Sequence, residues 1–337
     1  MVDLLYVQDY LSLVPTSPLV LVTSRSFSSG DLDLAGELEA VGCRIVTGPS
    51  THDLNALRPL LADATAWIAG TGPVTGAHLD AAPGLQLVAR YGVGVEAVAL
   101  AAAAARGVLV TNTPGANTGA VADHAVALVL AGLRDVAAGD RGVRAGRWAV
   151  QRTRELGTLT VGIVGLGRIG RAVATRLGGF GSTLLGFDPW VPQVELERLG
   201  IEGVDLDTLA RRADVISLHA PGESVVVDEG FLAAVKPDLV LVNTARATLV
   251  DEPALAEALR AGRLRCYASD VLGSEAGDHA NPLLATDLLD RTVCTPHSAA
   301  QTVQAVDGMG RGAVDAVLAH LRGDSPPNLV PLPGGPR

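Results

Sequence analysis

The chain has 337 residues, of which 48% are hydrophobic and 18% are charged, and its formal net charge is -10 at pH 7. This length exceeds what one hydrophobic core usually supports, so we expect two domains. The sequence pI of about 5.1 and the absence of a basic run argue against nucleic acid and anionic membranes as partners, because both need a basic surface.

The cysteines and the apolar runs exclude two further classes. Cys43, Cys266 and Cys294 show no CxxC spacing and no cluster of histidines, so no metal site is expected and we interpret them as small buried residues. No Lys or Arg precedes Arg25, which is not the charge pattern of a targeting signal. The apolar runs are much shorter than the roughly 18 residues of a membrane-spanning helix. We therefore expect a cytoplasmic protein without a membrane partner.

The first part of the chain predicts five strands. Short runs rich in valine and isoleucine alternate with alanine- and leucine-rich stretches of helical period, which is typical of parallel sheets covered by helices on both faces. The strands are predicted at residues 19–23, 43–47, 66–69, 87–91 and 108–111. A turn-rich segment at 112–119 then precedes a long apolar helix over 121–133, so a domain boundary is expected here.

The second part predicts a complete doubly wound sheet. Its six strands are expected at residues 160–164, 183–187, 215–219, 239–243, 265–270 and 293–295. A helix over 305–321 follows, and the chain ends in a tail rich in proline and glycine.

A dinucleotide-binding fingerprint opens this second series. Residues 159–177 combine a strand, a glycine turn and the start of a helix. In such a turn Gly165 permits the bend, Gly167 lets the backbone approach a pyrophosphate, and Gly170 allows close packing of strand and helix. The helix N-terminus would present free N–H groups to the anion.

The end of the next strand strengthens this interpretation. Asp188 lies 18 residues after Gly170, where the hydroxyls of an adenosine ribose are expected. Its carboxylate would repel a 2'-phosphate, and Pro189 and Trp190 stand where an NADP enzyme often has arginine. The sequence therefore favours NAD over NADP.

Motifs on both sides of the fingerprint carry a family resemblance. In chain order they are RYGVGVE (90–96), VTNTPG (110–115), VADHA (121–125), SLHAP (217–221), VNTAR (242–246), LVDE (249–252), DVLGSE (270–275) and TPH (295–297). They resemble the D-isomer-specific 2-hydroxyacid dehydrogenase family, in its phosphoglycerate dehydrogenase-like branch without a regulatory domain. The resemblance implies an α/β fold of two Rossmann-like doubly wound domains. A nucleotide-binding domain (111–298) would be inserted into a flavodoxin-like substrate domain (1–110 and 299–337), with the active site in the cleft between them.

The resemblance also implies an activity and a catalytic set. The expected enzyme is an NAD-dependent oxidoreductase that transfers a hydride between NAD(H) and C2 of a small D-2-hydroxy or 2-oxo acid. His297 would act as acid in reduction and as base in oxidation, and Glu275 would stabilise its imidazolium. Arg246 would contact the substrate carbonyl and carboxylate, and the backbone amides of Val93 and Gly94 would bind that carboxylate.

Further cofactor contacts are implied in the same way. They are Arg168 and Ile169 at the pyrophosphate, Ala220 and Pro221 near the adenosine, and Thr244, Ala245 and Asp270 at the nicotinamide. Among the histidines, His124 and His219 match family positions and are interpreted as structural or cofactor-adjacent. The others are interpreted as surface residues: His52, His78, His279 and His320.

The distal end of the substrate is less determined by the sequence. Ala69 stands where phosphoglycerate dehydrogenases tend to carry an arginine, and Tyr91 puts a phenol beside the carboxylate loop. Arg90 and Arg134 are the remaining candidate anion partners. The candidate substrates are 3-phosphoglycerate, a phosphonate relative, and smaller acids such as glyoxylate or hydroxypyruvate.

Several alternatives remain open at this point. One is a glyoxylate/hydroxypyruvate reductase, another is a phosphite dehydrogenase, and a third is an NAD-sensing, corepressor-like binding protein. Formate dehydrogenase is disfavoured, because its histidine is paired with glutamine and this chain has Glu275. A homodimer is expected, with the helix 121–133 and the loop to Trp148 as its interface.

Overall fold

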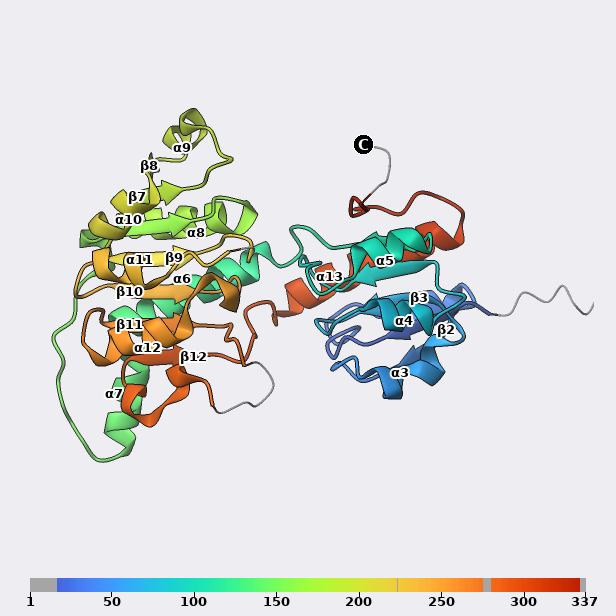
Figure 1. The fold of residues 1–337 in the computed structure, drawn as a ribbon, viewed down its shortest axis with the longest axis horizontal. Helices are drawn as coiled ribbons and strands as arrows, with labels where there is room; N and C mark the ends of the chain where they lie inside the picture. The colour runs from blue at the N-terminus through green and yellow to red at the C-terminus, as the bar shows by residue number, and fades with distance from the viewer. Residues whose placement is uncertain (1–16, 223, 275–279, 334–337) are drawn as a thin grey trace, which may run out of the picture. The chain divides into compact units, whose positions relative to one another are not determined.

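The computed structural model describes residues 17–222, 224–274 and 280–333 and divides into two compact units (Figure 1). Unit 1 comprises Met1–Asn117 and Gln301–Arg337, and unit 2 comprises Thr118–Ala300. The chain therefore passes between the units twice. Among the described helices, none combines the length and the apolar character that a membrane span requires.

Unit 1 contains a five-stranded parallel sheet in the order β2-β1-β3-β4-β5. Its strands are β1 (Leu19–Val22), β2 (Arg44–Thr47), β3 (Ala64–Ala69), β4 (Leu87–Arg90) and β5 (Leu109–Thr111). Its helices are α2 (Leu34–Ala40), α3 (Leu54–Leu61), α4 (Gly76–Asp80), α5 (Leu100–Ala105) and α13 (Val303–Leu321). All residues of β1 and β4 are buried, as expected when helices cover both faces of a parallel sheet.

Helix α13 returns the end of the chain to unit 1. It packs against β4 and α2, and the buried face of this helix is mostly alanine, valine and glycine. At Gly310 an added Cβ would lie 2.3 Å from Leu34 Cδ1, so a larger residue there would force the Leu34 side chain of α2 to move. The strand order of unit 1 is that of flavodoxin-like sheets, which confirms the predicted fold class.

Unit 2 contains a seven-stranded parallel sheet in the order β12-β11-β10-β9-β6-β7-β8. Its strands are β6 (Thr160–Val164), β7 (Thr183–Phe187), β8 (Glu202–Gly203), β9 (Val215–Leu218), β10 (Val240–Asn243), β11 (Cys266–Ser269) and β12 (Thr292–Cys294). Its α-helices are α6 (Thr118–Leu133), α7 (Val136–Arg144), α8 (Arg168–Gly178), α9 (Gln193–Arg198), α10 (Leu206–Arg212), α11 (Glu229–Ala234) and α12 (Glu252–Arg260). Short 3-10 turns lie at Leu156–Thr158 (η1), Ala247–Leu249 (η2), Pro282–Leu284 (η3) and Thr286–Leu288 (η4).

Two hydrophobic layers cover this sheet. One is formed by α6 and α8 and the other by α10, α11 and α12, each with the strand residues that face it. The strand order reverses between β6 and β9, and ligands of doubly wound sheets bind at such a reversal, outside the carboxyl ends of the strands. The six predicted strands of this unit are present, and the two-residue strand β8 extends the sheet beyond them.

Two interpretations of histidines were wrong. His52 and His78 were expected at the surface, but their exposed fractions are 2% and 3%. The His52 ring lies 5.0 Å from the Trp67 ring, between centroids, and the His78 Nε2–H donates to the His52 carbonyl oxygen at 2.9 Å. Both rings are therefore part of the core of unit 1, whereas His279 lies outside the described residues.

The hydrogen bonds around Thr23 define the state of His52. His52 Nδ1 lies 3.0 Å from the Pro73 carbonyl oxygen, so Nδ1 carries the hydrogen, and Nε2 accepts the Thr23 hydroxyl at 2.7 Å. The Thr23 oxygen in turn accepts the Trp67 indole N–H at 2.9 Å and the Gly70 N–H at 3.2 Å. Burial lowers the pKa of His52 to about 4, so the ring is neutral.

One cysteine also differs from its interpretation. Cys43 and Cys266 are buried as expected, whereas Cys294 is exposed. It is the last residue of β12, which forms one edge of the seven-stranded sheet. A side chain on an edge strand is not enclosed by a neighbouring strand, and this explains the exposure.

Candidate active site

The glycine turn after β6 has the geometry of a dinucleotide loop. Gly165 has a φ of +90°, and an added Cβ would lie 2.6 Å from the Ala220 nitrogen. An added Cβ at Gly170 would lie 2.0 Å from the Gly165 carbonyl oxygen. The backbone conformation and the packing therefore require glycine at these two positions.

Gly167 has no such internal reason to be glycine. Its φ of -69° is open to any residue, and an added Cβ would meet no atom within 4 Å. It is the N-cap of α8, whose first N–H groups have no partner within the helix. The open space beside Gly167 and the free N–H groups of this helix start fit a bound pyrophosphate. As the first helical residues, Arg168 and Ile169 would contact it too.

Asp188 lies directly after β7 and is half-buried. One of its carboxylate oxygens accepts the Leu166 N–H at 2.7 Å, and the other accepts the Trp190 N–H at 2.9 Å. The first of these bonds brings the carboxylate to the glycine turn itself. Each oxygen retains a lone pair, so the group can still accept ribose hydroxyls.

Two buried polar atoms without partners lie at the ends of the next strands. The Nδ1 atom of His219, just after β9, and the Oγ1 atom of Thr244, just after β10, are inaccessible and form no hydrogen bond within the described part of the chain. Burial lowers the pKa of His219 to about 4, and its Nε2 lies 2.8 Å from Ser217 Oγ. Because buried polar atoms are normally satisfied, these two fit a polar ligand at the carboxyl edge, next to Ala220, Pro221 and Ala245.

Arg246 is presented by a turn that Asn243 organises. The Asn243 side chain donates to the Arg246 carbonyl oxygen at 2.8 Å and accepts the Ala245 N–H at 3.0 Å. The Arg246 guanidinium donates to the Ala245 carbonyl oxygen at 2.8 Å, and the residue is half-buried. The amide of Asn243 thus closes the turn that carries the arginine at the end of β10.

His297 occupies a loop with an unusual backbone. It is exposed, and its φ of +51° is a left-handed conformation that costs a non-glycine residue about 1 kcal/mol. Its N–H donates to the carbonyl oxygens of Asp270 and Thr295, both at 3.0 Å. Such a conformation persists where the surrounding structure holds it, and this is common at functional sites. Glu275, the predicted partner of His297, lies outside the described residues.

A loop after β4 presents backbone donors in unit 1. The Gly92 carbonyl oxygen accepts the Thr113 N–H at 3.0 Å, and the Val93 carbonyl oxygen accepts the Asn112 side-chain N–H at 2.8 Å. The Gly94 carbonyl oxygen accepts Arg90 Nε–H at 3.0 Å. With these carbonyls directed into the protein, the N–H groups of Val93 and Gly94 find no acceptor among the described residues. Consecutive free amides of this kind suit a carboxylate.

Arg90 has a different environment from the one the sequence suggested. It is 7% exposed, and its guanidinium also donates to the carbonyl oxygens of Thr71 at 3.0 Å and Gly72 at 3.2 Å. The buried side chain therefore joins the loop after β3 to the loop after β4. The Arg90 guanidinium thus holds these two loops together, and its direct contact with the substrate stays a prediction.

Tyr91 also differs from its expected place. The residue is 6% exposed, and its hydroxyl donates to the Val306 carbonyl oxygen at 2.9 Å. Burial raises the pKa of Tyr91 above its usual value. The phenol is thus directed into the core against α13, and it does not narrow a pocket at the carboxylate loop.

Arg134 lies at the opposite edge of the sheet of unit 2 from Asp270 and His297. An added Cβ at Gly132 would lie 3.0 Å from Cγ1 of Val240, the first residue of β10, so α6 ends at the amino ends of the strands. Arg134 is exposed there and donates from Nε to Thr153 Oγ1 at 2.8 Å. Among the described residues of this unit, it does not join the other predicted site residues.

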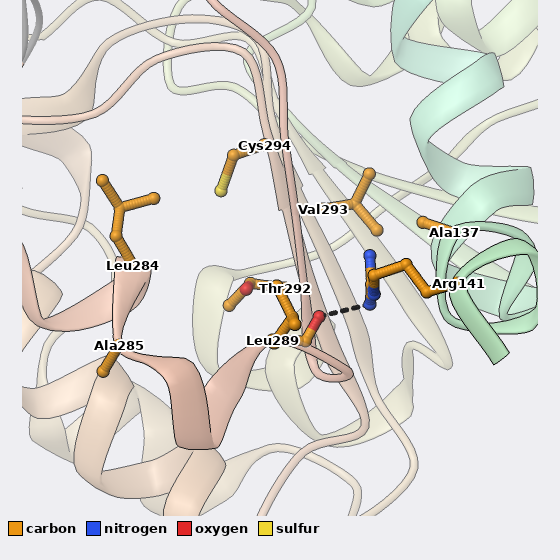
Figure 2. A pocket seen from close by; sticks show the side chains of 8 residues that line it. All are labelled: Ala137, Arg141, Leu284, Ala285, Leu289, Thr292, Val293 and Cys294. Carbon is orange, nitrogen blue, oxygen red and sulfur yellow. Dashed lines mark hydrogen bonds between the residues drawn. The ribbon is translucent and has the colours of Figure 1, made fainter. Parts of the chain in front are cut away.

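Two cavities lie elsewhere in the molecule. One, of about 240 Å³, is lined by residues from α7 and from the segment 284–294, as Figure 2 shows; they are Ala137, Arg141, Leu284, Ala285, Leu289, Thr292, Val293 and Cys294. The other, of about 330 Å³, lies at the carboxyl ends of β1 and β2 and includes Arg25, whose Nε donates to Ser50 Oγ at 2.6 Å. Neither cavity contains a predicted site residue, and no group of residues in the described ranges could hold a metal ion.

The fold and this carboxyl edge define a class of protein. Unit 2 has a doubly wound sheet with a glycine turn, an acidic group after the second strand, and buried polar atoms at the strand ends that lack partners among the described residues. This combination is typical of a dinucleotide-binding α/β protein. The family model described as D-isomer specific 2-hydroxyacid dehydrogenase, NAD binding domain, matches residues 126–299. The chain belongs to this family, and its cofactor is a nicotinamide dinucleotide.

Similar proteins extend the match over the rest of the chain. D-3-phosphoglycerate dehydrogenase of Mycobacterium leprae is 39% identical over 326 residues, which are 94% of this chain and 60% of that relative. The chain thus spans about 60% of the length of this relative. Glyoxylate reductase of Korarchaeum cryptofilum is 37% identical over 89% of each chain. The crystal structure of D-lactate dehydrogenase from Aquifex aeolicus with NAD and lactic acid has a TM-score of 0.82, 26% identity and coverage of 95% of this chain and 100% of that one.

Proposed function

We propose that the protein is a dehydrogenase that transfers a hydride between NAD(H) and C2 of a small D-2-hydroxy or 2-oxo acid. The observation that carries the proposal is the placement of Arg246 and His297. They follow β10 and β12 at the carboxyl edge of the same sheet that carries the glycine turn. A cation and a proton donor are the two groups that reduction of a 2-oxo acid requires beside the cofactor.

Each group has a separate task in this proposal. The bound cofactor supplies or accepts the hydride. His297 donates a proton to the carbonyl oxygen in reduction and accepts it in oxidation, and Glu275 is proposed to stabilise the charged imidazole. Arg246 binds the carbonyl and carboxylate with its planar fork, and the N–H groups of Val93 and Gly94 bind the carboxylate.

The environment of Arg90 favours a substrate without a distal phosphate. Its guanidinium is engaged by three carbonyl oxygens, and the Ala69 side chain is fully buried. We therefore propose glyoxylate or hydroxypyruvate as the preferred class. The relatives named phosphoglycerate dehydrogenase make 3-phosphohydroxypyruvate the essential competitor in the test, together with phosphite and a phosphonate analogue.

The preferred cofactor is proposed to be NAD. The Asp188 carboxylate accepts the N–H of Leu166 in the glycine turn and would repel the 2'-phosphate of NADP. Dissociation constants from NADH and NADPH fluorescence titrations test this point. Tighter binding of NADPH would contradict it.

The assembly is proposed to be a homodimer that works in the cytoplasm. Large apolar side chains are exposed on α7 and the segment after it, with exposed fractions of 58% for Val136, 83% for Trp148 and 90% for Val150. A contiguous patch of exposed apolar side chains is typical of a protein interface, and these three residues are proposed to belong to one. Light scattering during size-exclusion chromatography should give the mass of a dimer for the unsubstituted protein. The variant Trp148→Glu is expected to sediment as a monomer.

The central experiment compares four variants on a panel of 2-oxo acids. We expect His297→Ala and Arg246→Ala to lower kcat/KM by a factor of about 10³ or more. The dissociation constant of NADH should change by less than about threefold, because neither group is proposed to hold the dinucleotide. His320→Ala and Arg322→Ala are matched controls on and after α13 and should retain full activity. If NADH binds but nothing in the panel is turned over, the NAD-sensing, corepressor-like role replaces this proposal.

A further inference from the structure

The loop that carries His297 forms several of its hydrogen bonds with one buried residue, Asp270. Asp270 lies one position after β11 and is 1% exposed. Its backbone carbonyl accepts the His297 N–H at 3.0 Å, and its two carboxylate oxygens accept the N–H groups of Ser298 at 2.9 Å and Ala299 at 2.8 Å. Three consecutive amides of the loop therefore donate to Asp270.

Thr295 adds a hydroxyl on the other side of His297. Its Oγ1 lies 2.5 Å from Asp270 Oδ1, and since an ionised carboxylate has no hydrogen, the threonine donates. The same Oγ1 lies 2.9 Å from His124 Nε2, so His124 carries a hydrogen on Nε2 and donates to Thr295. The hydrogen bonds thus run in one direction, from His124 to Thr295 to Asp270.

His124 extends this series of hydrogen bonds to helix α6. His124 lies in the second turn of α6, which begins at Thr118, the first residue of unit 2. Ala299 lies next to Ala300, the last residue of that unit. The network therefore joins the segment where the chain enters unit 2 to the loop from which it leaves.

We propose that His124, Thr295 and Asp270 form a positioning network that sets the orientation of the His297 imidazole for proton transfer. The proposal rests on the proposed catalytic role of His297 and adds two positioning residues, His124 and Thr295, to the reaction. Charge-assisted bonds to the buried carboxylate hold the loop on both sides of His297. The left-handed backbone of His297 is then maintained without substrate.

The test uses the hydroxyl of Thr295, because it can be removed without changing the shape of the side chain. Thr295→Val removes the donor to Asp270, and Thr295→Ser keeps it. Thr292→Val is the matched control, since Thr292 lies at the start of β12 and its hydroxyl donates to the Leu288 carbonyl oxygen at 3.1 Å. His124→Leu and His124→Gln form a second pair, in which only glutamine retains an N–H donor.

Two measurements separate the network from the reaction itself. Amide hydrogen exchange of the peptide that contains Ser298 and Ala299 reports on the loop whether or not the enzyme turns over. We expect Thr295→Val to raise this exchange rate about tenfold or more and to lower kcat with glyoxylate about 10- to 100-fold. The KM for glyoxylate and the dissociation constant of NADH should stay within about threefold. Thr295→Ser and His124→Gln should remain close to the unsubstituted protein in both measurements.

Each outcome decides the proposal. The network is overturned if the amide exchange of Thr295→Val is unchanged. It is also overturned if Thr292→Val or Thr295→Ser loses as much kcat as Thr295→Val does. A change in KM alone would also overturn it, because a mispositioned acid lowers kcat. If the exchange changes as expected but His297→Ala is fully active, the network exists and the catalytic role of His297 is what fails.

Discussion

Acid should destabilise unit 1 through His52, and the size of the effect follows from its pKa. The ring is neutral with a pKa of about 4, against 6.5 for an unperturbed histidine. As the pH falls below 6.5, the unfolded chain takes up a proton that the folded chain does not, so stability is lost between pH 6.5 and 4 and is fully present above that range. Between pH 8 and pH 5 the expected loss from His52 is about 2 kcal/mol.

The physical reason lies in the hydrogen bonds of the ring. A proton on His52 Nε2 would face the hydroxyl of Thr23, whose oxygen already accepts two N–H groups. His52→Asn removes the titrating group, and asparagine tolerates the φ of +56° better than most residues. The variant is expected to be less stable than the unsubstituted protein at pH 8, because it loses packing against Trp67. Between pH 8 and pH 5, the free energy of unfolding of this variant should fall by about 2 kcal/mol less than that of the unsubstituted protein.

Urea unfolding at pH 8 and pH 5 measures this difference. His219, with a similarly lowered pKa, contributes equally to both proteins and cancels in the comparison. His320→Asn is the control, since His320 lies near the end of α13, where its ring contacts the side chain of Gln86. This variant should keep the full pH dependence of stability. The reasoning is refuted if His52→Asn loses as much stability between the two pH values as the unsubstituted protein does.

Two other variants test the backbone of the site. Gly170→Ala would place a Cβ 2.0 Å from the Gly165 carbonyl oxygen, and we expect it to weaken NADH binding at least about tenfold in a fluorescence titration. Gly178→Ala is the control in the same helix, because its added Cβ would meet only Leu184 Cδ1 at 3.7 Å, and it should bind NADH normally. If the two variants bind NADH equally well, the packing argument is wrong. Arg90→Lys should raise the KM for the 2-oxo acid about tenfold and change kcat by less than about threefold, because a lysine ammonium cannot hold the three carbonyl oxygens in the geometry of the guanidinium. Initial-rate measurements that show an unchanged KM would refute the role of Arg90 in holding the loops.

Much of the fold was predictable because its signals are local. The strands predicted at 160–164 and 183–187 have the bounds of β6 and β7, since apolar runs end there at a glycine turn or at an acidic residue. Strand β8 was not predictable, because Glu202–Gly203 has no apolar pattern. It exists only through its pairing with Leu185 and Gly186 of β7.

The site was less predictable where its chemistry depends on distant partners. The sequence identifies Arg90 as a cation near the carboxylate loop, but only the fold brings the carbonyls of Thr71 and Gly72 to its guanidinium. Likewise, nothing local shows that α6 runs opposite to the strands and carries Arg134 to their amino ends. Asp270 was expected at the nicotinamide, which stays a prediction, while its bonds to the 298–299 amides were visible only in the structure.

The division of unit 1 into two sequence segments has a consequence for synthesis on the ribosome. Unit 2 is one continuous segment, so it can complete its core as soon as Ala300 is available. The first 117 residues lack α13 until about 200 further residues have been made, which takes roughly 10 to 40 seconds at typical translation rates. During that interval the faces of β4 and α2 that α13 later covers are open, so we expect nascent chains to depend on chaperones before the last helix is added.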